Sequence, residues 1–262
     1  MQNSHFVLVT GSAGRVGQTV VAELTARGHR VRGFDLAPTP GATESLVGTI
    51  ADTALCARAC AGADTLVHLA ATPDDDDFMS RLLPDNLIGL YHIMEAARLA
   101  GVKRVILASS GQVNWWHTMK GPWPIHPREP VAPKYWYAAT KMFMESIGRS
   151  YSEMHGQSVI IARLGWCPRT RAQVAEIAAA DWAQDVYLSP GDSGRFFACA
   201  VEAPADLKFA TVYATSNPVH LFRYDLEPTQ QLLGFTPRDQ WPTGIDIVKQ
   251  PTHLVGIEDT RL

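Results

Sequence analysis

Short apolar runs alternate with longer segments of helical periodicity through the first two thirds of the chain. Five runs have the length and composition of buried strands: residues 6–10, 30–34, 65–69, 104–108 and 158–163. Four segments carry apolar residues at helical spacing: residues 16–27, 53–61, 86–100 and 137–155. Gly28, Gly101 and Gly156 follow three of these segments, as glycines that end helices do. This alternation predicts an α/β fold, a Rossmann-type doubly wound parallel sheet with helices on both faces.

The pattern becomes less regular after Arg163, where proline and charged residues increase. Helices are still expected at residues 172–184, 192–201 and 226–233, and a strand at residues 209–214. We therefore predict a nucleotide-binding core over residues 1–165. Residues 166–262 are expected to form a small substrate-capping region that also completes the core.

The composition of the chain excludes several classes of function but does not identify one. The 262 residues are 46% hydrophobic, which argues against intrinsic disorder, and the net charge of −3 gives no electrostatic basis for binding nucleic acid or an anionic membrane. The four cysteines are too few for a disulfide scaffold and lack the spacing of a zinc site, so no metal is expected. No signal sequence and no membrane-spanning apolar stretch of about 20 residues is present. These features predict a cytoplasmic protein that acts on a small molecule.

A glycine-rich turn joins the first expected strand to the first expected helix. Its form is Gly-x-x-Gly-x-x-Gly, with glycines at positions 11, 14 and 17. Such a turn lets a pyrophosphate approach a helix N-terminus, where unpaired N–H groups and the helix dipole favour an anion. The turn therefore predicts a dinucleotide site.

Asp35 ends the second expected strand, where its carboxylate can accept hydrogen bonds from both ribose hydroxyls of an adenosine. The same charge repels the additional phosphate of NADP. Arg15 and Arg32 are nearby cations that could offset this repulsion. We therefore predict NAD as the cofactor, with a preference that is not absolute.

Tyr137 and Lys141 are four residues apart, which places them on one face of the expected long helix. A phenol has a pKa of about 10 and is a poor base at neutral pH unless a cation stabilises the phenolate. Lys141 is placed to supply that cation, and the charge of a nicotinamide ring would add to it. Ser109 and Ser110 close the strand before this helix, so their hydroxyls are expected at the carboxyl end of the sheet, where doubly wound folds bind ligands.

These features, taken in order, resemble the extended short-chain dehydrogenase/reductase superfamily, and within it the NAD-dependent epimerase/dehydratase family. The landmarks span residues 6–165: Thr-Gly-x-x-Gly-x-x-Gly at 10–17, Asp35, Val67-His68-Leu69-Ala70-Ala71, Asn86-x-x-Gly89, Ala108-Ser109-Ser110, Tyr137 with Lys141, and Arg163-Leu164-Gly165. Residues 232–237, Leu-Leu-Gly-Phe-Thr-Pro, also resemble a C-terminal element of the family.

The resemblance implies roles for individual residues. Ser110 would polarise the substrate oxygen, Tyr137 would exchange its proton, and Lys141 would bind the nicotinamide ribose and lower the pKa of Tyr137. The cofactor would lie against a larger set: Gly11, Ala13, Gly14, Arg15, Val16, Gly17, Asp35, Ile50, Asp52, Leu69, Ala70, Asn86, Ser109, Tyr137 and Lys141. Thr49 stands where the family usually has an acidic residue, so one adenine hydrogen bond would be lost or replaced.

The chain is short for this family, because only residues 142–262 follow Lys141 and nucleotide-sugar enzymes carry a longer C-terminal part. It most resembles the uronate dehydrogenase-like branch, which oxidises free hexuronates with NAD. The resemblance is carried by residues 86–91 and 163–167. The expected substrate residues are Ser110, Gly111, Trp166, Arg169 and Arg171.

The substrate side departs from that branch, which has small polar residues where this chain has Pro73, Gly111 and Trp166. Arg169 and Arg171 would clamp a carboxylate or phosphate, or else form a solvated loop. Four tryptophans lie in the flanking loops and would stack on a sugar ring, wall off an apolar carbonyl substrate, or pack under a flap: Trp115, Trp116, Trp123 and Trp136.

Two other features are given structural interpretations. The run of four aspartates at 74–77 lacks the alternating ligands and glycine turn of a calcium loop, so a solvated acidic rim is expected. His68 is expected to orient backbone near the cofactor rather than to act as an acid or base.

The sequence as a whole predicts an NAD-dependent oxidoreductase that oxidises a hydroxyl of a small free sugar or sugar acid, with Tyr137 as general base. The alternatives are an NAD(P)-dependent epimerase or carbonyl reductase that uses the same three residues, and a non-catalytic NAD-sensing protein. By resemblance, a homodimer or higher homo-oligomer would form through two long helices, including residues 137–155.

Overall fold

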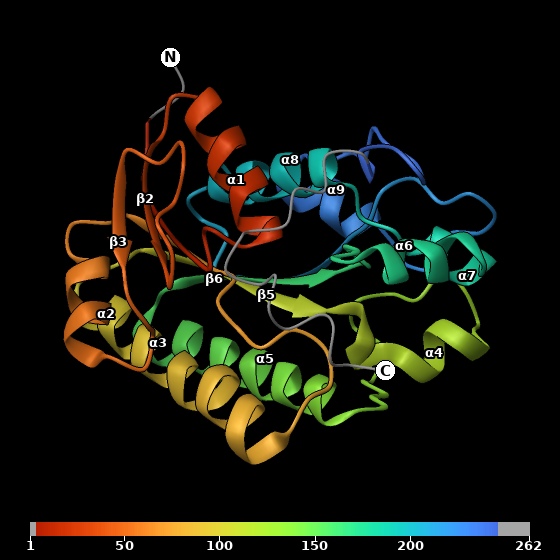
Figure 1. The fold of residues 1–262 in the computed structure, drawn as a ribbon, viewed down its shortest axis with the longest axis horizontal. Helices are drawn as coiled ribbons and strands as arrows, with labels where there is room; N and C mark the ends of the chain where they lie inside the picture. The colour runs from red at the N-terminus through yellow and green to blue at the C-terminus, as the bar shows by residue number, and fades with distance from the viewer. Residues whose placement is uncertain (1–3, 246–262) are drawn as a thin grey trace.

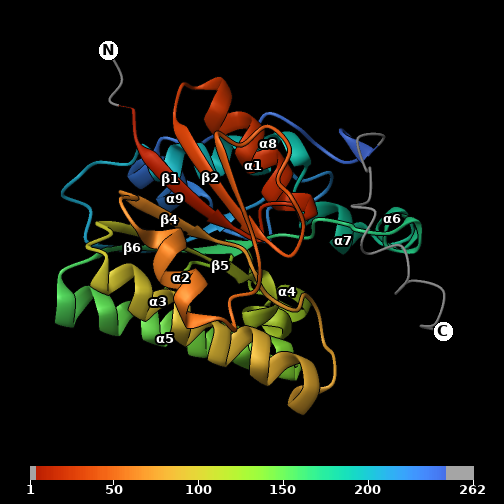
Figure 2. The ribbon, with the colours of Figure 1, turned by 60° about the vertical axis from the view of Figure 1, so that its left-hand side comes forward.

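The computed structural model describes residues 4–245 and has a parallel sheet at its centre (Figures 1 and 2). The strands of this part of the chain are β1 (Phe6–Thr10), β2 (Arg30–Asp35), β3 (Glu44–Val47), β4 (Thr65–His68), β5 (Arg104–Ser110), β6 (Ser158–Leu164) and β7 (Phe209–Ala214). They are ordered β3-β2-β1-β4-β5-β6-β7, and all neighbours pair in parallel. The chain builds outward from β1 to β3, then crosses to β4 on the other side of β1. This doubly wound order confirms the predicted fold class.

Helices cover both faces of the sheet. One face carries α1 (Arg15–Ala26), α8 (Pro190–Val201) and α9 (Glu227–Leu233); the other carries α2 (Thr53–Cys60), α3 (Gly89–Leu99) and α5 (Trp136–His155) (Figure 1). Side chains alternate along β1, so Val7 and Val9 enter the core under α1 and α8, whereas Leu8 enters the core under α2 and α3. Phe196 and Phe197 of α8 are fully buried, and each contributes about 1.5–3 kcal/mol by leaving water.

Additional helical segments lie beyond the carboxyl ends of the strands or lead into a covering helix. These are α4 (Trp115–Lys120), α6 (Arg171–Ala178), α7 (Asp181–Asp185), a 3-10 turn (Gly111–Asn114) and a π-helical segment (Phe78–Ile88). The π-helical segment runs directly into α3. Figure 1 shows α4, α6 and α7 together at one end of the sheet, the end at which β5 and β6 finish.

Some expected elements differ from those observed. Helical structure before α3 begins at Phe78 rather than at residue 86, with Pro84 inside it. The single helix expected at 172–184 is two short helices, because the chain leaves helical structure around Ala180. β3 and α4 were not expected.

Part of the predicted capping region belongs to the core. β7 pairs with β6, and α8 packs closely on α1, where a Cβ on Gly194 would lie 2.9 Å from the carbonyl oxygen of Thr19. The division at residue 165 stays a prediction, and residues 246–262 of the second region lie outside the described residues.

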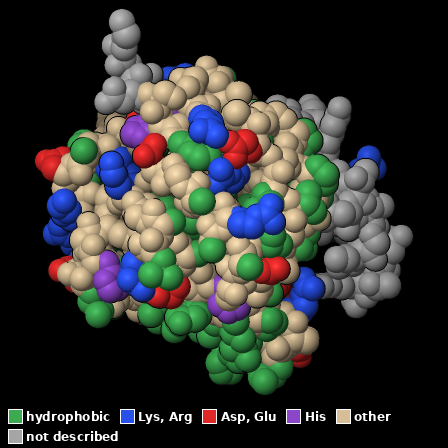
Figure 3. Space-filling view, turned by 90° about the vertical axis from the view of Figure 1, so that its left-hand side faces the viewer, with side chains coloured by type: hydrophobic (Ala, Val, Ile, Leu, Met, Phe, Trp, Pro, Cys, Tyr) green, Lys and Arg blue, Asp and Glu red, His purple; other side chains and the backbone are tan. Residues whose placement is uncertain are grey.

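The surface carries mixed charge, and hydrophobic side chains gather along the lower edge of the face in Figure 3, on the side where α3 and α5 lie in Figure 1. No helix among residues 4–245 is long and apolar enough to cross a membrane. All four cysteines are free thiols.

Candidate active site

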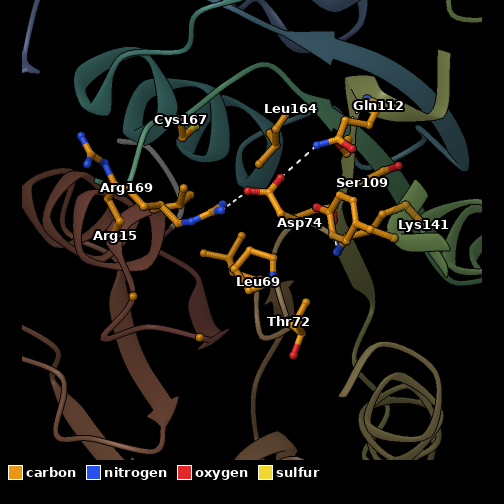
Figure 4. A pocket seen from close by; sticks show the side chains of 18 of the residues that line it. Arg15, Leu69, Thr72, Asp74, Ser109, Gln112, Lys141, Leu164, Cys167 and Arg169 are labelled. Carbon is orange, nitrogen blue, oxygen red and sulfur yellow. Dashed lines mark hydrogen bonds and ion pairs between the residues drawn. The ribbon is translucent and has the colours of Figure 1, made fainter. Parts of the chain in front are cut away.

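A cavity of about 700 Å³ lies at the carboxyl ends of β1, β4, β5 and β6, where the strand order reverses (Figure 4). Sixteen of the predicted residues line it: Gly11, Gly14, Arg15, Val16, Gly17, Asp35, Ile50, Leu69, Ala70, Ser109, Ser110, Gly111, Tyr137, Lys141, Trp166 and Arg169. One cavity therefore joins the expected dinucleotide site to the expected catalytic residues.

The glycine turn is held too tightly for side chains. Gly11 has φ +67°, and a Cβ there would lie 2.7 Å from the backbone nitrogen of Ala70. A Cβ on Gly17 would lie 2.2 Å from the carbonyl oxygen of Gly11. Within the described chain, no side chain caps α1 at Gly14, so the N–H groups of its first turn remain for an anion.

Arg15 gives independent support for an anionic ligand. Its Nη1 and Nη2 atoms are buried and have no hydrogen-bond partner among residues 4–245, and burial lowers the pKa of the guanidinium. A buried unpaired cation is costly, whereas Arg–phosphate pairs are strong. The side chain lines the cavity at the first turn of α1, so the residues present fit the pyrophosphate of a dinucleotide.

Asp35 lies at the end of β2, and its Oδ2 accepts the N–H of Ala13 at 2.9 Å. The expectation that Arg32 offsets its charge is wrong. Nε of Arg32 donates to Glu44 at 2.7 Å, and its Nη1 donates to the carbonyl oxygen of Ala59 at 2.7 Å. Because side chains alternate along a strand, Arg32 and Asp35 extend to opposite faces.

Four predicted residues lie outside the lining that the described residues form: Ala13, Asp52, Asn86 and Arg171. Asp52 caps the N-terminus of α2, and Arg171 is exposed at the start of α6. Asn86 is buried, accepts the N–H of Thr72 at 2.8 Å and donates to Oγ1 of Thr140 at 3.1 Å. Asn86 therefore ties the loop after β4 to α5. The predicted ligand contacts of these residues stay predictions.

Ser110, Tyr137 and Lys141 come together as the spacing predicted. Tyr137 is in the first turn of α5, Lys141 lies one turn later, and Ser110 ends β5 and hydrogen-bonds to the Tyr137 side chain. Nζ of Lys141 lies 5.5 Å from the centre of the Tyr137 ring and donates to the carbonyl oxygen of Ala108 at 3.0 Å. All three side chains line the cavity.

The pKa of Tyr137 is raised above its usual range, first by burial and then by the charge of Asp74, whereas Arg169 and the Ser110 hydrogen bond act in the opposite direction. Burial lowers the pKa of Lys141 to about 8. The residues alone therefore keep the phenol protonated at neutral pH. A further positive charge beside it would be needed to favour the phenolate.

A buried network supports the end of β5. Oγ of Ser109 donates to Oε1 of Glu145 at 2.6 Å, and Glu145 is held by Nε and Nη2 of Arg163 at 2.9 and 2.8 Å. Glu145 lies one helical turn beyond Lys141 on α5. The network fixes α5, which carries Tyr137 and Lys141, against β6 and against β5, which carries Ser110. A cofactor contact of Ser109 stays a prediction.

His68 is buried, and its Nδ1 lies 2.8 Å from Oγ1 of Thr10. Burial and the nearby Lys141 charge lower the pKa of His68 to about 3, so the ring is neutral. Oγ1 of Thr10 also accepts the N–H groups of Leu69 and Ala70 at 3.2 and 3.3 Å. His68 thus contacts the Thr10 hydroxyl that holds backbone at the cavity, and its expected role near the cofactor stays a prediction.

The aspartate run is only in part the solvated rim that was expected: Asp75 and Asp77 are exposed, whereas Asp74 lines the cavity. Asp74 enters the cavity, where it pairs with Arg169 and accepts hydrogen bonds from Nε2 of Gln112 at 3.0 Å and Nε2 of Gln173 at 3.2 Å (Figure 4). Its φ is +62°, the sole positive value at a non-glycine residue within residues 4–245.

Other members of the run fix helices. Oδ1 of Asp75 accepts the N–H of Tyr137 at 3.0 Å, and Oδ1 of Asp77 accepts the N–H of Ser80 at 2.8 Å. The run therefore links the start of α5, the π-helical segment and the cavity.

Aromatic side chains form one wall of the cavity. The rings of Trp166 and Trp182 are stacked with centres 5.7 Å apart, and Trp115 meets Trp182 edge-on at 5.4 Å. The hydroxyl of Tyr224 occupies the space beside Gly111, 2.4 Å from where a Cβ would lie. Trp182 and Tyr224 were not predicted. Of the described tryptophans, four others lie outside the lining: Trp116, Trp123, Trp136 and Trp241.

Comparison with known proteins identifies the family. The model of the NAD dependent epimerase/dehydratase family matches residues 7–166. The chain belongs to this family.

Relatives with this fold include sugar dehydrogenases. The chain is 28% identical over 255 residues to an L-arabinose 1-dehydrogenase (NAD(P)(+)) of Haloferax volcanii, covering 92% of this chain and 99% of the relative. It is 33% identical over 168 residues to a uronate dehydrogenase of Agrobacterium fabrum, covering 62% of this chain and 61% of the relative. A mutant uronate dehydrogenase from Agrobacterium tumefaciens, solved with NAD, has a TM-score of 0.75 at 25% identity, covering 94% of this chain and 89% of that chain.

Proposed function

We propose that this protein is an NAD-dependent dehydrogenase that oxidises a hydroxyl group of a small free sugar or sugar acid. The observation that carries the proposal is the placement of Ser110, Tyr137 and Lys141 in the cavity that also holds the glycine turn and Asp35. The arabinose and uronate dehydrogenase relatives support the substrate class.

Each residue has a distinct task in this reaction. A bound oxidised nicotinamide would supply the hydride acceptor for the carbon that bears the hydroxyl, and a positive charge that favours the Tyr137 phenolate. Tyr137 takes the proton of the substrate hydroxyl at its phenolic oxygen. The Ser110 hydroxyl donates a hydrogen bond to the substrate oxygen as that oxygen becomes a carbonyl. Lys141 stabilises the phenolate before the proton moves.

The test is formation of NADH from NAD with a panel of free uronates, aldoses and simple alcohols. Tyr137→Phe removes the proton acceptor with little change in shape, so we expect kcat to fall by about 10²- to 10⁴-fold. NAD affinity, measured by calorimetry, should remain close to that of the wild type. Full activity of Tyr137→Phe would contradict the mechanism, and tight NAD binding without turnover of any substrate would favour a sensor.

We also infer that two copies of the chain pair through α3 and α5. Large exposed hydrophobic side chains on these helices support this pairing: Tyr91, Leu99, Trp136, Phe143 and Met154. Phe143→Glu should shift the protein toward the monomer in sedimentation experiments; a monomeric wild type would refute the pairing. The free thiols support a reducing, cytoplasmic location.

A further inference from the structure

The substrate end of the cavity is organised around the carboxylate of Asp74. In Figure 4 this carboxylate lies between Arg169 and Gln112, with Ser109 and Lys141 to one side. Asp74 and Tyr137 line the same cavity, and Asp75, the next residue, accepts the N–H of Tyr137 at 3.0 Å, so the charge of Asp74 acts on the phenol. Asp74 therefore lies beside the place where a substrate hydroxyl must meet Tyr137.

The charged side chains that line the whole cavity balance one another. Within the described residues the lining contains four basic and four acidic side chains: Arg15, Arg81, Lys141 and Arg169, with Asp35, Asp74, Asp85 and Glu176. Arg169 pairs with Asp74, and Arg81 lies 4.0 Å from Asp85. Arg15 fits the pyrophosphate, and Lys141 serves Tyr137. A substrate carboxylate here would meet the charge of Asp74, and every cation that the described residues place in the lining already has another role, which makes its binding unfavourable.

A carboxylate in this position suits hydroxyl groups. An ionised carboxylate is an acceptor only and has about four acceptor positions on its two oxygens. Oδ2 of Asp74 accepts hydrogen bonds from Arg169 and Gln173, whereas within residues 4–245 Oδ1 accepts one from Gln112 only. Oδ1 therefore retains capacity for a substrate hydroxyl. Hydrogen bonds from neutral donors to an ionised acceptor are roughly twice as strong as neutral ones.

The backbone presents this carboxylate in an uncommon way. The φ of +62° is a left-handed conformation that non-glycine residues seldom adopt and that Asp and Asn tolerate best. Three side chains from two other segments then hold the carboxylate in place, namely Gln112, Arg169 and Gln173. The stacked Trp166 and Trp182 add an apolar wall suited to the C–H face of a sugar ring.

We propose that Asp74 binds substrate hydroxyls and sets specificity, so that the substrate is a neutral, hydroxyl-rich sugar and not an anionic sugar acid. This inference rests on the proposed dehydrogenase function. Repulsion separates the two substrate classes, because the same negative charge that accepts hydrogen bonds from hydroxyl groups repels a substrate carboxylate.

The experiment compares sugars that differ only in whether a hydroxymethyl group or a carboxylate is attached to the ring. The pairs are galactose with galacturonate and glucose with glucuronate, each assayed for NADH formation with NAD. We expect the wild type to favour at least one neutral member over its acid by tenfold or more in kcat/KM.

Asp74→Asn removes the charge, keeps an acceptor and suits the left-handed backbone. It should shift the ratio toward the acid by roughly ten- to hundredfold, since a hydrogen bond to a charged group weakens and Arg169 loses its counter-charge. Asp206→Asn is the matched control: it makes the same charge change at an exposed side chain outside the cavity lining, and it should leave the ratio unchanged.

The outcomes separate this inference from the function on which it rests. Equal oxidation of both members, or faster oxidation of the acid, by the wild type overturns the role of Asp74 and leaves the dehydrogenase function standing. An unchanged ratio in a folded Asp74→Asn protein overturns it as well. If that variant does not fold, the ratio of kcat/KM for the neutral sugar to kcat/KM for its acid in the wild type still tests the role of Asp74. Absence of NADH formation with every sugar overturns the proposed function together with this inference.

Discussion

Asp35 should decide between NAD and NADP, and Asp35→Asn should relax that choice. The carboxylate lies at the adenosine end of the cavity and accepts the N–H of Ala13. Arg32 is held by Glu44 and by carbonyl groups at the end of α2, so it cannot receive a 2′-phosphate placed beside Asp35. The additional phosphate of NADP would therefore meet an uncompensated negative charge.

The size of the effect follows from Coulomb's law. Two unit charges about 4 Å apart repel by roughly 1 kcal/mol in bulk water and roughly 4 kcal/mol at an effective dielectric constant of about 20. Because Asp35 is partly exposed, the discrimination should lie between these limits, which correspond to a factor of about 5 to 1000 in kcat/KM. Asn keeps an acceptor for Ala13 while it removes the charge.

The assay is the ratio of kcat/KM for NAD to kcat/KM for NADP with one saturating sugar, at low and high salt. We expect a clear NAD preference in the wild type that falls at least fivefold in Asp35→Asn. Asp206→Asn, an exposed change of the same charge before β7, serves as the control. Equal use of both dinucleotides by the wild type, or an unchanged ratio in Asp35→Asn, would refute the reasoning.

Three further predictions concern the cofactor end of the site. Arg15→Gln should weaken NAD binding by roughly ten- to hundredfold while raising the melting temperature of the cofactor-free protein, because a buried unpaired cation is removed; unchanged affinity in calorimetry would contradict this. Lys141→Met should stabilise the cofactor-free protein by up to about 3 kcal/mol near neutral pH, since the lysine pKa falls from 10.5 unfolded to about 8 folded. The cost of burying the charged lysine is complete below about pH 8 and decreases as the pH rises toward 10.5. The difference in unfolding free energy between variant and wild type, measured with urea, should therefore decrease between pH 8 and pH 10.5. A difference that stays constant would count against the burial argument. Gly17→Ala should cost about 3 kcal/mol or more of unfolding free energy, because its Cβ would lie 2.2 Å from backbone, whereas Gly14→Ala, with its nearest contact at 3.1 Å, should cost much less in the same measurement.

The core elements could be predicted because they are buried on both faces and read as continuous apolar runs. β1, β5 and β6 are of this kind, and their bounds agree with the expected runs within two residues at either end. β3 was missed because it is a four-residue edge strand in which half-buried and exposed residues alternate. The helical segment at Phe78–Ile88 was missed because Pro84 and irregular turns interrupt the 3.6-residue period.

In the site, too, the features that depend on neighbouring residues in the sequence could be predicted, and those that depend on distant residues could not. The glycine turn and the Tyr137–Lys141 pair are local in sequence, so spacing alone predicted them. Asp74 and Arg169 are 95 residues apart, and four consecutive aspartates carry no periodicity that would set one of them apart. A usable signal was nevertheless present, since both residues closely follow strands that flank β5, and carboxyl ends of parallel strands share one edge of the sheet.

Two buried cations, Arg15 and Lys141, destabilise the cofactor-free protein, so the lifetime of the protein should depend on the concentration of its cofactor. Arg15 has no partner for its terminal nitrogens within residues 4–245, and burial disfavours the charged form of Lys141. A ligand that binds only the folded chain stabilises it by about 2.7 kcal/mol at one hundred times its Kd. When the dinucleotide is scarce, a larger fraction of molecules will be unfolded and open to proteases. We therefore expect the steady-state amount of this protein in a cell to follow the NAD concentration even when its synthesis is constant.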